Sequence, residues 1–264
     1  MKRFSFNTNR RLGFTLIELL VVVSVVAVLL AILLPSLSMV RAIANRVGCG
    51  SNLKQISLAW VTYLDDHDGR FYQGIRANFD YGGWRGIKNW WPRPLNYYVG
   101  LNDPNDVTQS NAKVFCCPSD KGGIPGAFLR EKAYLVHGTS YQTNIFLIGQ
   151  DRCGAFSEKT NALDMEISQR LTNLNRSSVA NPSLLLLIGD FGWINQWKPT
   201  AYPEEEWKEL AEWHRKTDYH CMAFLDGHVK FQNIRKGFYV TSEYWVLPFE
   251  DLRDLALKLQ GSIE

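Results

Sequence analysis

The sequence predicts an α+β protein in which one long N-terminal, membrane-spanning helix precedes a globular domain built on a mainly antiparallel β-sheet. Three stretches of the 264-residue chain indicate this: an apolar run at 14–34, a buried strand at 184–190 and a β-hairpin at 220–231. The expected parts are a basic leader at 1–13, the membrane helix at 14–34, a helix continuation at 35–66 and a globular domain with loop-rich insertions at 67–264.

The first of these stretches has the length of a membrane span. At a rise of 1.5 Å per residue it gives a helix of ~31 Å, about the thickness of a bilayer's hydrocarbon core. The segment 1–13 holds four basic residues and no acid. Positive residues stay on the cytoplasmic side, so the chain after Leu34 is expected outside the inner membrane. A cleaved secretory signal is the competing interpretation, but it requires a shorter apolar core and a clearer small-residue cleavage site than Ser36-Leu37-Ser38.

One carboxylate interrupts the apolar run. Glu18 lies five residues into it, counting from Phe14. An acid inside a bilayer costs a few kcal/mol on insertion scales, and such residues usually have a partner and a function. A plain signal anchor with an accidental acid is the alternative.

The segment Gly13-Phe14-Thr15-Leu16-Ile17-Glu18 resembles the prepilin-type cleavage and methylation motif of type IV pilins and type II secretion pseudopilins. The resemblance implies that a prepilin peptidase cuts between Gly13 and Phe14 and that Phe14 becomes N-methylated. It also implies that Glu18 acts in filament assembly. Pro35 corresponds to a position at which the family often has a helix-bending proline.

The charge balance gives no support for nucleic-acid binding. The formal net charge is +3, but four of the 29 basic residues lie in the leader, which leaves 25 basic and 26 acidic side chains. A near-neutral domain lacks the basic face that binds nucleic acid. Aromatic residues make up 13% of the chain, with nine Trp, which indicates a folded domain.

Five cysteines occur, and no C-x-x-C pair that would predict a zinc ribbon or a redox motif. We expect a disulfide between Cys49, at the junction of helix and domain, and Cys117, beside Pro118. Such a bridge would close a loop of about 70 residues and stabilise the fold by a few kcal/mol. Cys116 is the rival partner, because the sequence does not separate adjacent cysteines.

Further segments resemble one large subgroup of pilin-like proteins that has a long C-terminal domain ending in a histidine and Asp-Gly. They are Cys49-Gly50-Ser51-Asn52-Leu53-Lys54-Gln55-Ile56, Cys117-Pro118-Ser119-Asp120 and Ser140-Tyr141-Gln142-Thr143-Asn144. The subgroup has its histidine nine residues before Asp-Gly, whereas His214 here has eleven before Asp226. That departure indicates a two-residue insertion.

Other elements follow from local patterns. Two glycines at 48 and 50 disfavour a continuous helix there. A short strand that runs into a turn is expected within 114–120, a helix at 204–214 and an amphipathic helix at 247–259. Asp226-Gly227 between alternating strands predicts a two-residue type I′ turn. The aromatic-rich segment 69–130 is interpreted as loops with Trp anchors, with stacking on sugar rings as the alternative.

The sequence offers a few candidate metal ligands and no catalytic motif. The metal candidates are His214, Asp226 and His228, with His220 and Asp190 as further possible ligands. The alternative is that Asp226 and Gly227 only form the turn while the histidines pack the sheet edge. No cofactor is expected apart from a structural divalent ion such as calcium, and no EF-hand loop is present. No catalytic motif occurs, so no enzyme is expected.

The resemblance thus implies a structural subunit of a type II secretion or type IV pilus-like filament. Its partners would be the prepilin peptidase, other pilin-like subunits and the inner membrane, with the domain periplasmic. The opposing hypothesis is a membrane-tethered binding or enzymatic domain, directed at glycans, that uses a pilin-type anchor.

Overall fold

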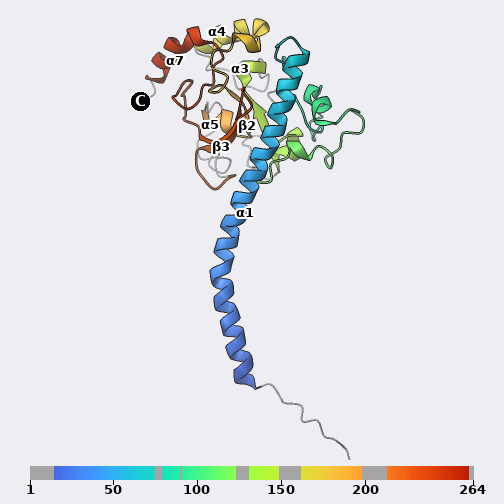
Figure 1. The fold of residues 1–264 in the computed structure, drawn as a ribbon, viewed down its shortest axis with the longest axis vertical. Helices are drawn as coiled ribbons and strands as arrows, with labels where there is room; N and C mark the ends of the chain where they lie inside the picture. Colours follow the sequence, from blue (N-terminus) through green and yellow to red (C-terminus); the bar gives the residue numbers. More distant parts are fainter. Residues whose placement is uncertain are drawn as a thin grey trace, which may run out of the picture. The chain divides into compact units, whose positions relative to one another are not determined.

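The computed structural model describes residues 15–74, 79–89, 91–122, 131–148, 162–197 and 213–261. It divides the chain into two compact units, residues 1–41 and 42–264. Helix α1 (Leu16–Asp66) begins in the first unit and ends in the second (Figure 1). The predicted α+β class is confirmed, because a four-stranded antiparallel sheet follows this long helix.

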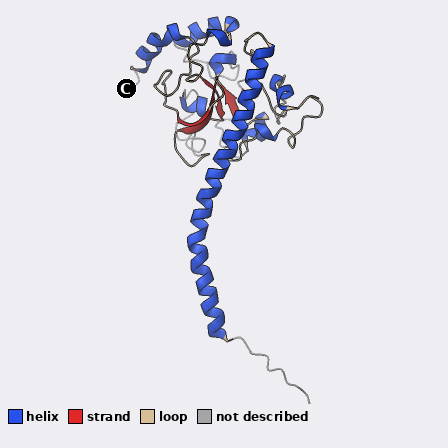
Figure 2. Ribbon diagram, viewed as in Figure 1, coloured by secondary structure: helices blue, strands red, loops and turns tan. Residues whose placement is uncertain are grey.

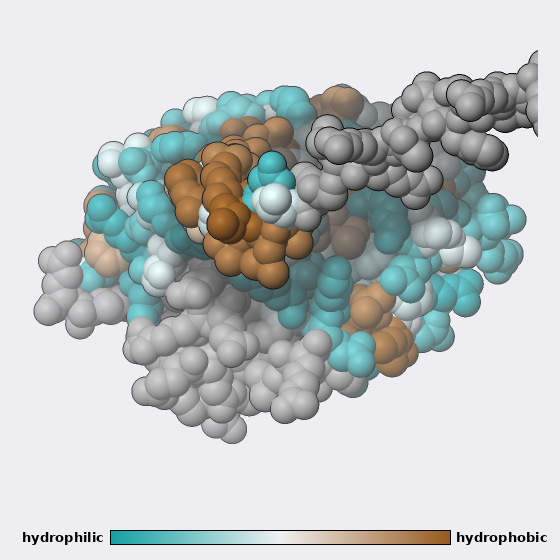
Figure 3. Space-filling model, turned by 90° about the horizontal axis from the view of Figure 1, so that it is seen from below, coloured by the Kyte–Doolittle hydropathy of each residue, from teal (hydrophilic) through white to brown (hydrophobic). Residues whose placement is uncertain are grey.

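The first unit presents its apolar side chains to the surroundings. From Leu16 to Leu34 the large apolar side chains are between 47% and 78% exposed. Figure 3, which looks at the molecule from the N-terminal end of α1, shows mostly brown, hydrophobic residues gathered at that end, with a few white and teal ones among them. The hydroxyls of Ser24 and Ser36 donate to backbone carbonyls three residues earlier, at 2.8 Å each. Helix α1 is therefore long and apolar enough to cross a membrane.

The part of α1 in the second unit is amphipathic. Its buried residues recur every three or four positions, which places them on one face: Cys49, Leu53, Ile56, Trp60, Tyr63 and Leu64. The helix continues through Gly48 and Gly50 without a break. A Cβ at Gly48 would lie 3.2 Å from the Pro118 ring, so glycine there lets the helix approach the segment that carries Cys117.

Three strands of the sheet are largely buried in the second unit, and the fourth, at one edge, is partly exposed (Figure 2). Its strands, in spatial order, are β1 (Tyr141–Thr143), β2 (Leu186–Asp190), β3 (Tyr219–Phe224) and β4 (Val229–Asn233). All five residues of β2 are buried, because β2 pairs on both sides and both of its faces are covered. This is the buried strand that the apolar run at 184–190 predicts.

The β3–β4 hairpin is present, but the predicted two-residue type I′ turn is wrong. Of Asp226 and Gly227, only the glycine has a positive φ, of 87°. The Gly227 amide donates to the Phe224 carbonyl, and the Phe224 amide donates to the His228 carbonyl, each at 2.9 Å. The loop is one residue longer on each side than expected, from Leu225 to His228, and the Asp226 carboxylate accepts the His228 amide within it at 3.0 Å. The loop belongs to the longer class in which a left-handed glycine follows the turn.

Short helices make up the rest of the described elements. The α-helices are α2 (Ala133–His137), α3 (Ile145–Ile148), α4 (Ala162–Arg170), α5 (Trp193–Trp197) and α7 (Arg253–Gln260). The 3₁₀ helices are η1 (Pro94–Val99), η2 (Lys113–Phe115), η3 (Leu171–Asn173), η4 (Arg176–Ser178) and η5 (Glu250–Leu252).

Three elements differ from the sequence predictions in their bounds or type, or cannot be compared with them. The short strand expected within 114–120 is wrong: η2 ends at Phe115, whose buried ring fixes the chain there. The C-terminal helix begins at Arg253, after η5. A salt bridge of 2.5 Å between Arg170 and Asp251 joins the end of α4 to η5. The helix expected at 204–214 lies outside the described residues up to 212.

Candidate metal centre

The cleavage site predicted from the sequence, Gly13 and Phe14, lies outside the described residues. Glu18 is described, at the first turn of α1. Its carboxylate accepts the Thr15 amide and the Thr15 hydroxyl, both at 2.9 Å, while the Glu18 amide donates to that hydroxyl at 3.2 Å. This reciprocal arrangement is a capping box, and the Thr-x-x-Glu spacing could have revealed it from the sequence.

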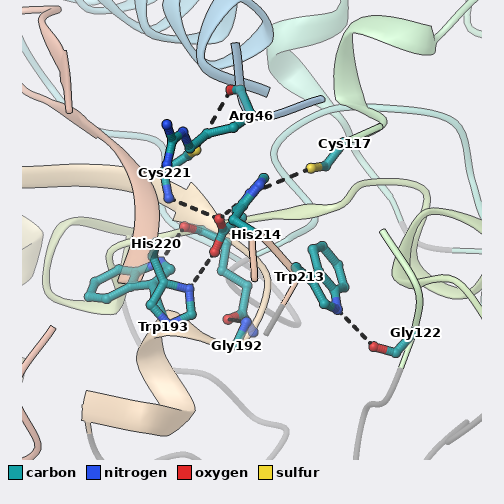
Figure 4. Close-up of polar contacts among 11 residues, drawn as sticks. Arg46, Cys117, Gly122, Gly192, Trp193, Trp213, His214, His220 and Cys221 are labelled. Atoms are coloured by element: carbon teal, nitrogen blue, oxygen red, sulfur yellow. Dashed lines mark hydrogen bonds and ion pairs between the residues drawn. The ribbon is translucent and has the colours of Figure 1, made fainter. Parts of the chain in front are cut away.

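Buried polar groups gather where β2, β3 and α1 meet (Figure 4). Gly189 pairs with Met222, which brings Asp190, at the end of β2, opposite His220 and Cys221 of β3. One oxygen of Asp190 contacts Nδ1 of His220. The other oxygen accepts the Cys221 amide at 2.9 Å. Asp190 is thereby held on both sides by the neighbouring strand.

His214 completes this group from the segment before β3. Its Nε2 lies 2.9 Å from Oδ2 of Asp190, and only 1% of either side chain is exposed. The neighbouring Trp213 is buried and donates to the Gly122 carbonyl at 3.0 Å, which fixes the segment. Among the described residues, Nδ1 of His214 is buried without a hydrogen-bond partner.

Three thiols surround the imidazole. Cys117 Sγ lies 3.9 Å from Nε2 of His214, and the Cys49 thiol contacts those of Cys117 and Cys221. The described cysteines are free, so the predicted Cys49–Cys117 disulfide is not formed in the structure. The two residues do meet, as expected, but Cys221 and His214 share the same space. Cys116, the rival partner, is only half-buried; its Sγ contacts the Cys117 carbonyl at 3.9 Å.

Electrostatic interactions set the protonation of this cluster. Burial acts to raise the pKa of Asp190, but the charges and hydrogen bonds of His220 and His214 outweigh it and hold the pKa well below its usual range. Burial acts to lower the pKa of His214, but hydrogen bonds to Asp190 and to two thiols raise it to about 12. Contact with Cys49 and His214 lowers the pKa of Cys221 to about 7 against the effect of burial. The cluster therefore favours an imidazolium–carboxylate pair beside an acidic thiol.

The arrangement does not match a nucleophilic Cys-His-Asp triad. In such a triad the acid and the nucleophile use opposite nitrogens of the imidazole. Here Asp190 and Cys117 both approach Nε2 of His214. The groups are also buried, with Cys49 0%, Asp190 1%, Cys221 2% and His214 5% exposed.

The predicted metal candidates separate into two places. Among the described residues, four ligand atoms lie within 4.8 Å of one another, and they belong to Cys49, Asp190, His214 and Cys221. Asp226 and His228 are instead partly exposed on the hairpin loop and pair with each other at 2.7 Å. Of the three predicted metal ligands, His214 lies in this cluster and Asp226 and His228 do not. The other ligand groups of the cluster belong to Cys49, Asp190 and Cys221. The sequence reasoning missed the cysteines as ligands because Cys221 is far along the chain from Cys49.

The segments that resemble the pilin-like subgroup supply side chains that form hydrogen bonds within the fold. Asp120, in the turn after Cys117, accepts the amides of Gly122 and Ala133 at 3.0 Å, that of Tyr134 at 2.8 Å and the Ser140 hydroxyl at 2.7 Å.

Two further residues of these segments tie distant parts together. The Asn52 side chain donates to the Cys116 carbonyl at 2.9 Å. The Asn144 amide donates to the Leu186 carbonyl at 2.8 Å and to that of Val246 at 2.7 Å. These residues hold the fold around the candidate site.

The aromatic loop has intramolecular contacts as well. Trp84 is half-buried and donates to the Tyr134 carbonyl at 2.8 Å. The Arg85 guanidinium stacks over the half-buried Trp91 ring, 4.1 Å from its centre. Both rings serve as anchors of the loop, whatever else they contact.

Comparisons with known proteins show what the N-terminal part of the chain is similar to. Residues 8–34 match the prokaryotic N-terminal methylation motif. The chain is 32% identical over 60 residues to "Competence protein ComGC" of Halalkalibacterium halodurans. That match covers 23% of this chain and 59% of the relative, so this chain spans less than two thirds of it. No solved structure matches.

These findings define a chain with a type IV pilin-like N-terminus on an α+β domain.

Proposed function

We propose that this chain is a structural subunit of a pilin-like filament, anchored in the inner membrane by its N-terminal helix before assembly. The observation that carries the proposal is the coincidence of the methylation motif, residues 8–34, with the exposed apolar part of α1. The similarity to a competence protein points the same way.

The apolar surface of α1 needs a partner in every state of the protein. Large apolar side chains over several turns are costly to leave in water, at about 25 cal/mol for each Å². A bilayer covers them before assembly. In a filament the same side chains pack against the corresponding helices of neighbouring subunits, so one surface serves both states.

Processing prepares the helix for this exchange. In our proposal a prepilin peptidase cuts between Gly13 and Phe14, and Phe14 is N-methylated while its amine stays cationic. Glu18 of one subunit then pairs with the amine of Phe14 in a neighbour. An unpaired charge in an apolar bundle is costly, so this pairing sets the register between subunits.

The filament is a type II secretion pseudopilus or a type IV pilus-like filament, with the domain from 67 onward on the outer side of the inner membrane. The alternative is a tethered binding or enzymatic domain that uses the helix only as an anchor. The two differ in one respect: a tethered domain does not polymerise.

Filament isolation tests the proposal. Cells with and without the prepilin peptidase are sheared, and the released filaments are probed for this chain. The proposal expects the chain in the filament fraction only when the peptidase is active. A fully processed chain that stays in the membrane fraction, beside filaments made of other subunits, would favour the tethered domain.

A further inference from the structure

The buried cluster in the second unit brings together side chains of the kinds that bind metal ions. Its four mutually close ligand groups are two thiols, one imidazole and one carboxylate. They come from distant parts of the chain: α1, the end of β2, the segment before β3, and β3 itself. A hydrophobic core gains little from burying such groups, because burial of charged or polar atoms is costly unless they are paired.

A second observation concerns the imidazole. Nε2 of His214 lies against Asp190, but Nδ1 is buried without a hydrogen-bond partner among the described residues. Buried ring nitrogens usually have a partner. Because Asp190 and the Cys117 thiol both approach Nε2, Nε2 is the ring nitrogen that would bind an ion held by these groups, and Nδ1 would keep the ring proton.

We propose that Cys49, Asp190, His214 and Cys221 bind one zinc ion, which ties α1 to the sheet.

The ligand types select the metal. Thiolate and imidazole together favour zinc, whereas calcium takes six to eight oxygen ligands, and only one of these four groups supplies oxygen. The four groups are nearly closed to solvent, which is the character of a structural site rather than a catalytic one.

Binding requires no electron transfer. The Zn²⁺ ion displaces the thiol protons of Cys49 and Cys221 and the second ring proton of His214, and these protons pass to solvent. Asp190 takes part as a carboxylate, the group that contacts the imidazoles of His214 and His220. His220 stays as the group that orients Asp190 through the other oxygen.

The ion would fix the point at which the filament helix enters the domain. Cys49 lies just after Gly48, whose lack of a side chain lets α1 approach Pro118. Cys221 Sγ also contacts the Arg46 carbonyl of α1 at 3.9 Å. A metal at this place links the helix to β2 and β3, so force applied along the helix would pass directly to the sheet.

Metal analysis of the full-length chain, extracted in detergent under anaerobic conditions without added metal, tests the proposal. We expect about one zinc per chain. The variants Cys49→Ser and Cys221→Ser should each retain less than about a fifth of it. Cys116→Ser is the matched control, because Cys116 is a half-buried neighbour of the cluster that supplies no ligand, and it should retain the wild-type amount.

A spectroscopic measurement distinguishes loss of a metal ligand from misfolding of the variant. Cobalt is exchanged into wild-type and variant chains whose circular dichroism matches. Wild type and Cys116→Ser should show a thiolate-to-cobalt charge-transfer band, and the Cys221→Ser chain should lose most of it. A wild-type chain with free thiols and no bound metal would overturn the proposal. So would a disulfide joining Cys49 to Cys117 or Cys221 in the chain as isolated.

Discussion

Nε2 of His214 lies 2.9 Å from Oδ2 of Asp190, and 1% of each side chain is exposed. Two imidazoles share this one carboxylate, because Oδ1 of Asp190 faces His220. Removing one partner of a buried ion pair leaves an uncompensated charge and typically costs several kcal/mol. The pair therefore joins the sheet to the segment that carries Trp213 and His214.

The first prediction follows from that pair. Asp190→Asn should lower the free energy of unfolding of the metal-free chain by about 3 kcal/mol or more, because an amide cannot balance the imidazolium. The measurement is chemical unfolding in detergent with a chelator, followed by Trp fluorescence. Asp226→Asn is the control: its pair with His228 is partly exposed, and we expect a change within about 0.5 kcal/mol. Equal effects of the two substitutions would contradict the role given to Asp190.

A second prediction concerns pH. Burial and the nearby charge of Arg93 lower the pKa of His137 from 6.5 to about 3. The unfolded chain therefore binds a proton at this residue between pH 6.5 and 3, and the folded chain does not. The contribution of His137 to stability is complete above pH 6.5 and is lost as the pH falls toward 3, on the order of 5 kcal/mol in total.

Replacing this histidine should remove that dependence. His137→Gln is expected to reduce the slope of unfolding free energy against pH between 4 and 6 relative to wild type. Carboxylates titrate in the same range in both chains, so the difference between the two slopes is the quantity to measure. Identical slopes would show that His137 is protonated in the folded domain.

The third prediction tests the hydrogen bonds at Asp120. Asp120→Ala would leave three buried amides and the Ser140 hydroxyl without their acceptor. We expect a loss of about 3 kcal/mol or more in unfolding free energy. Asp103→Ala is the matched control, since exposed Asp103 accepts the Asn105 amide at 2.8 Å in a surface turn. A similar small effect for both would refute a structural role for Asp120.

The sequence predicts elements whose patterns are local. The apolar run of α1, the buried strand β2 and the β3–β4 hairpin are examples, because each depends on periodicity or turn chemistry within a few residues. The capping box of Thr15 and Glu18 belongs here too and could have been predicted.

The candidate site depends on contacts that local patterns do not encode. Cys49 and Cys117 could be placed together from their positions beside helix and turn. Cys221 joins them only through the register of β2 against β3, which a bulge between Leu186 and Ile188 shifts. His214 reaches Asp190 although its spacing from Asp226 departs from the subgroup, and the hydrogen bond from Trp213 to the Gly122 carbonyl holds its segment in place.

A fourth prediction concerns processing. A small residue at the cut lets the peptidase reach the backbone, so Gly13→Arg should block cleavage and leave the leader attached. Mass spectrometry of the N-terminal peptide should find methylated Phe14 in wild type and the uncut leader in the variant. An intact leader on the wild-type chain, with the peptidase present, would contradict this.

The central claim is that Glu18 pairs between subunits. The capping box complicates a simple test, because Glu18 also holds the first turn of α1. Glu18→Gln separates the two roles, since glutamine keeps the capping geometry and loses the charge. Thr15→Val removes the hydroxyl of the capping box and leaves the charge of Glu18. Ser24→Ala is the control for loss of a polar side chain within the same helix.

The most direct measurement is competition for filament incorporation between processed, differently tagged wild-type and variant subunits in one cell. Glu18→Ala and Glu18→Gln should both enter at least about tenfold less often, which corresponds to ~1.4 kcal/mol. Thr15→Val and Ser24→Ala should enter within about twofold of wild type, a difference of less than ~0.5 kcal/mol. If both Glu18 variants enter as often as wild type, charge pairing does not direct assembly, and the helix is an anchor for a tethered domain.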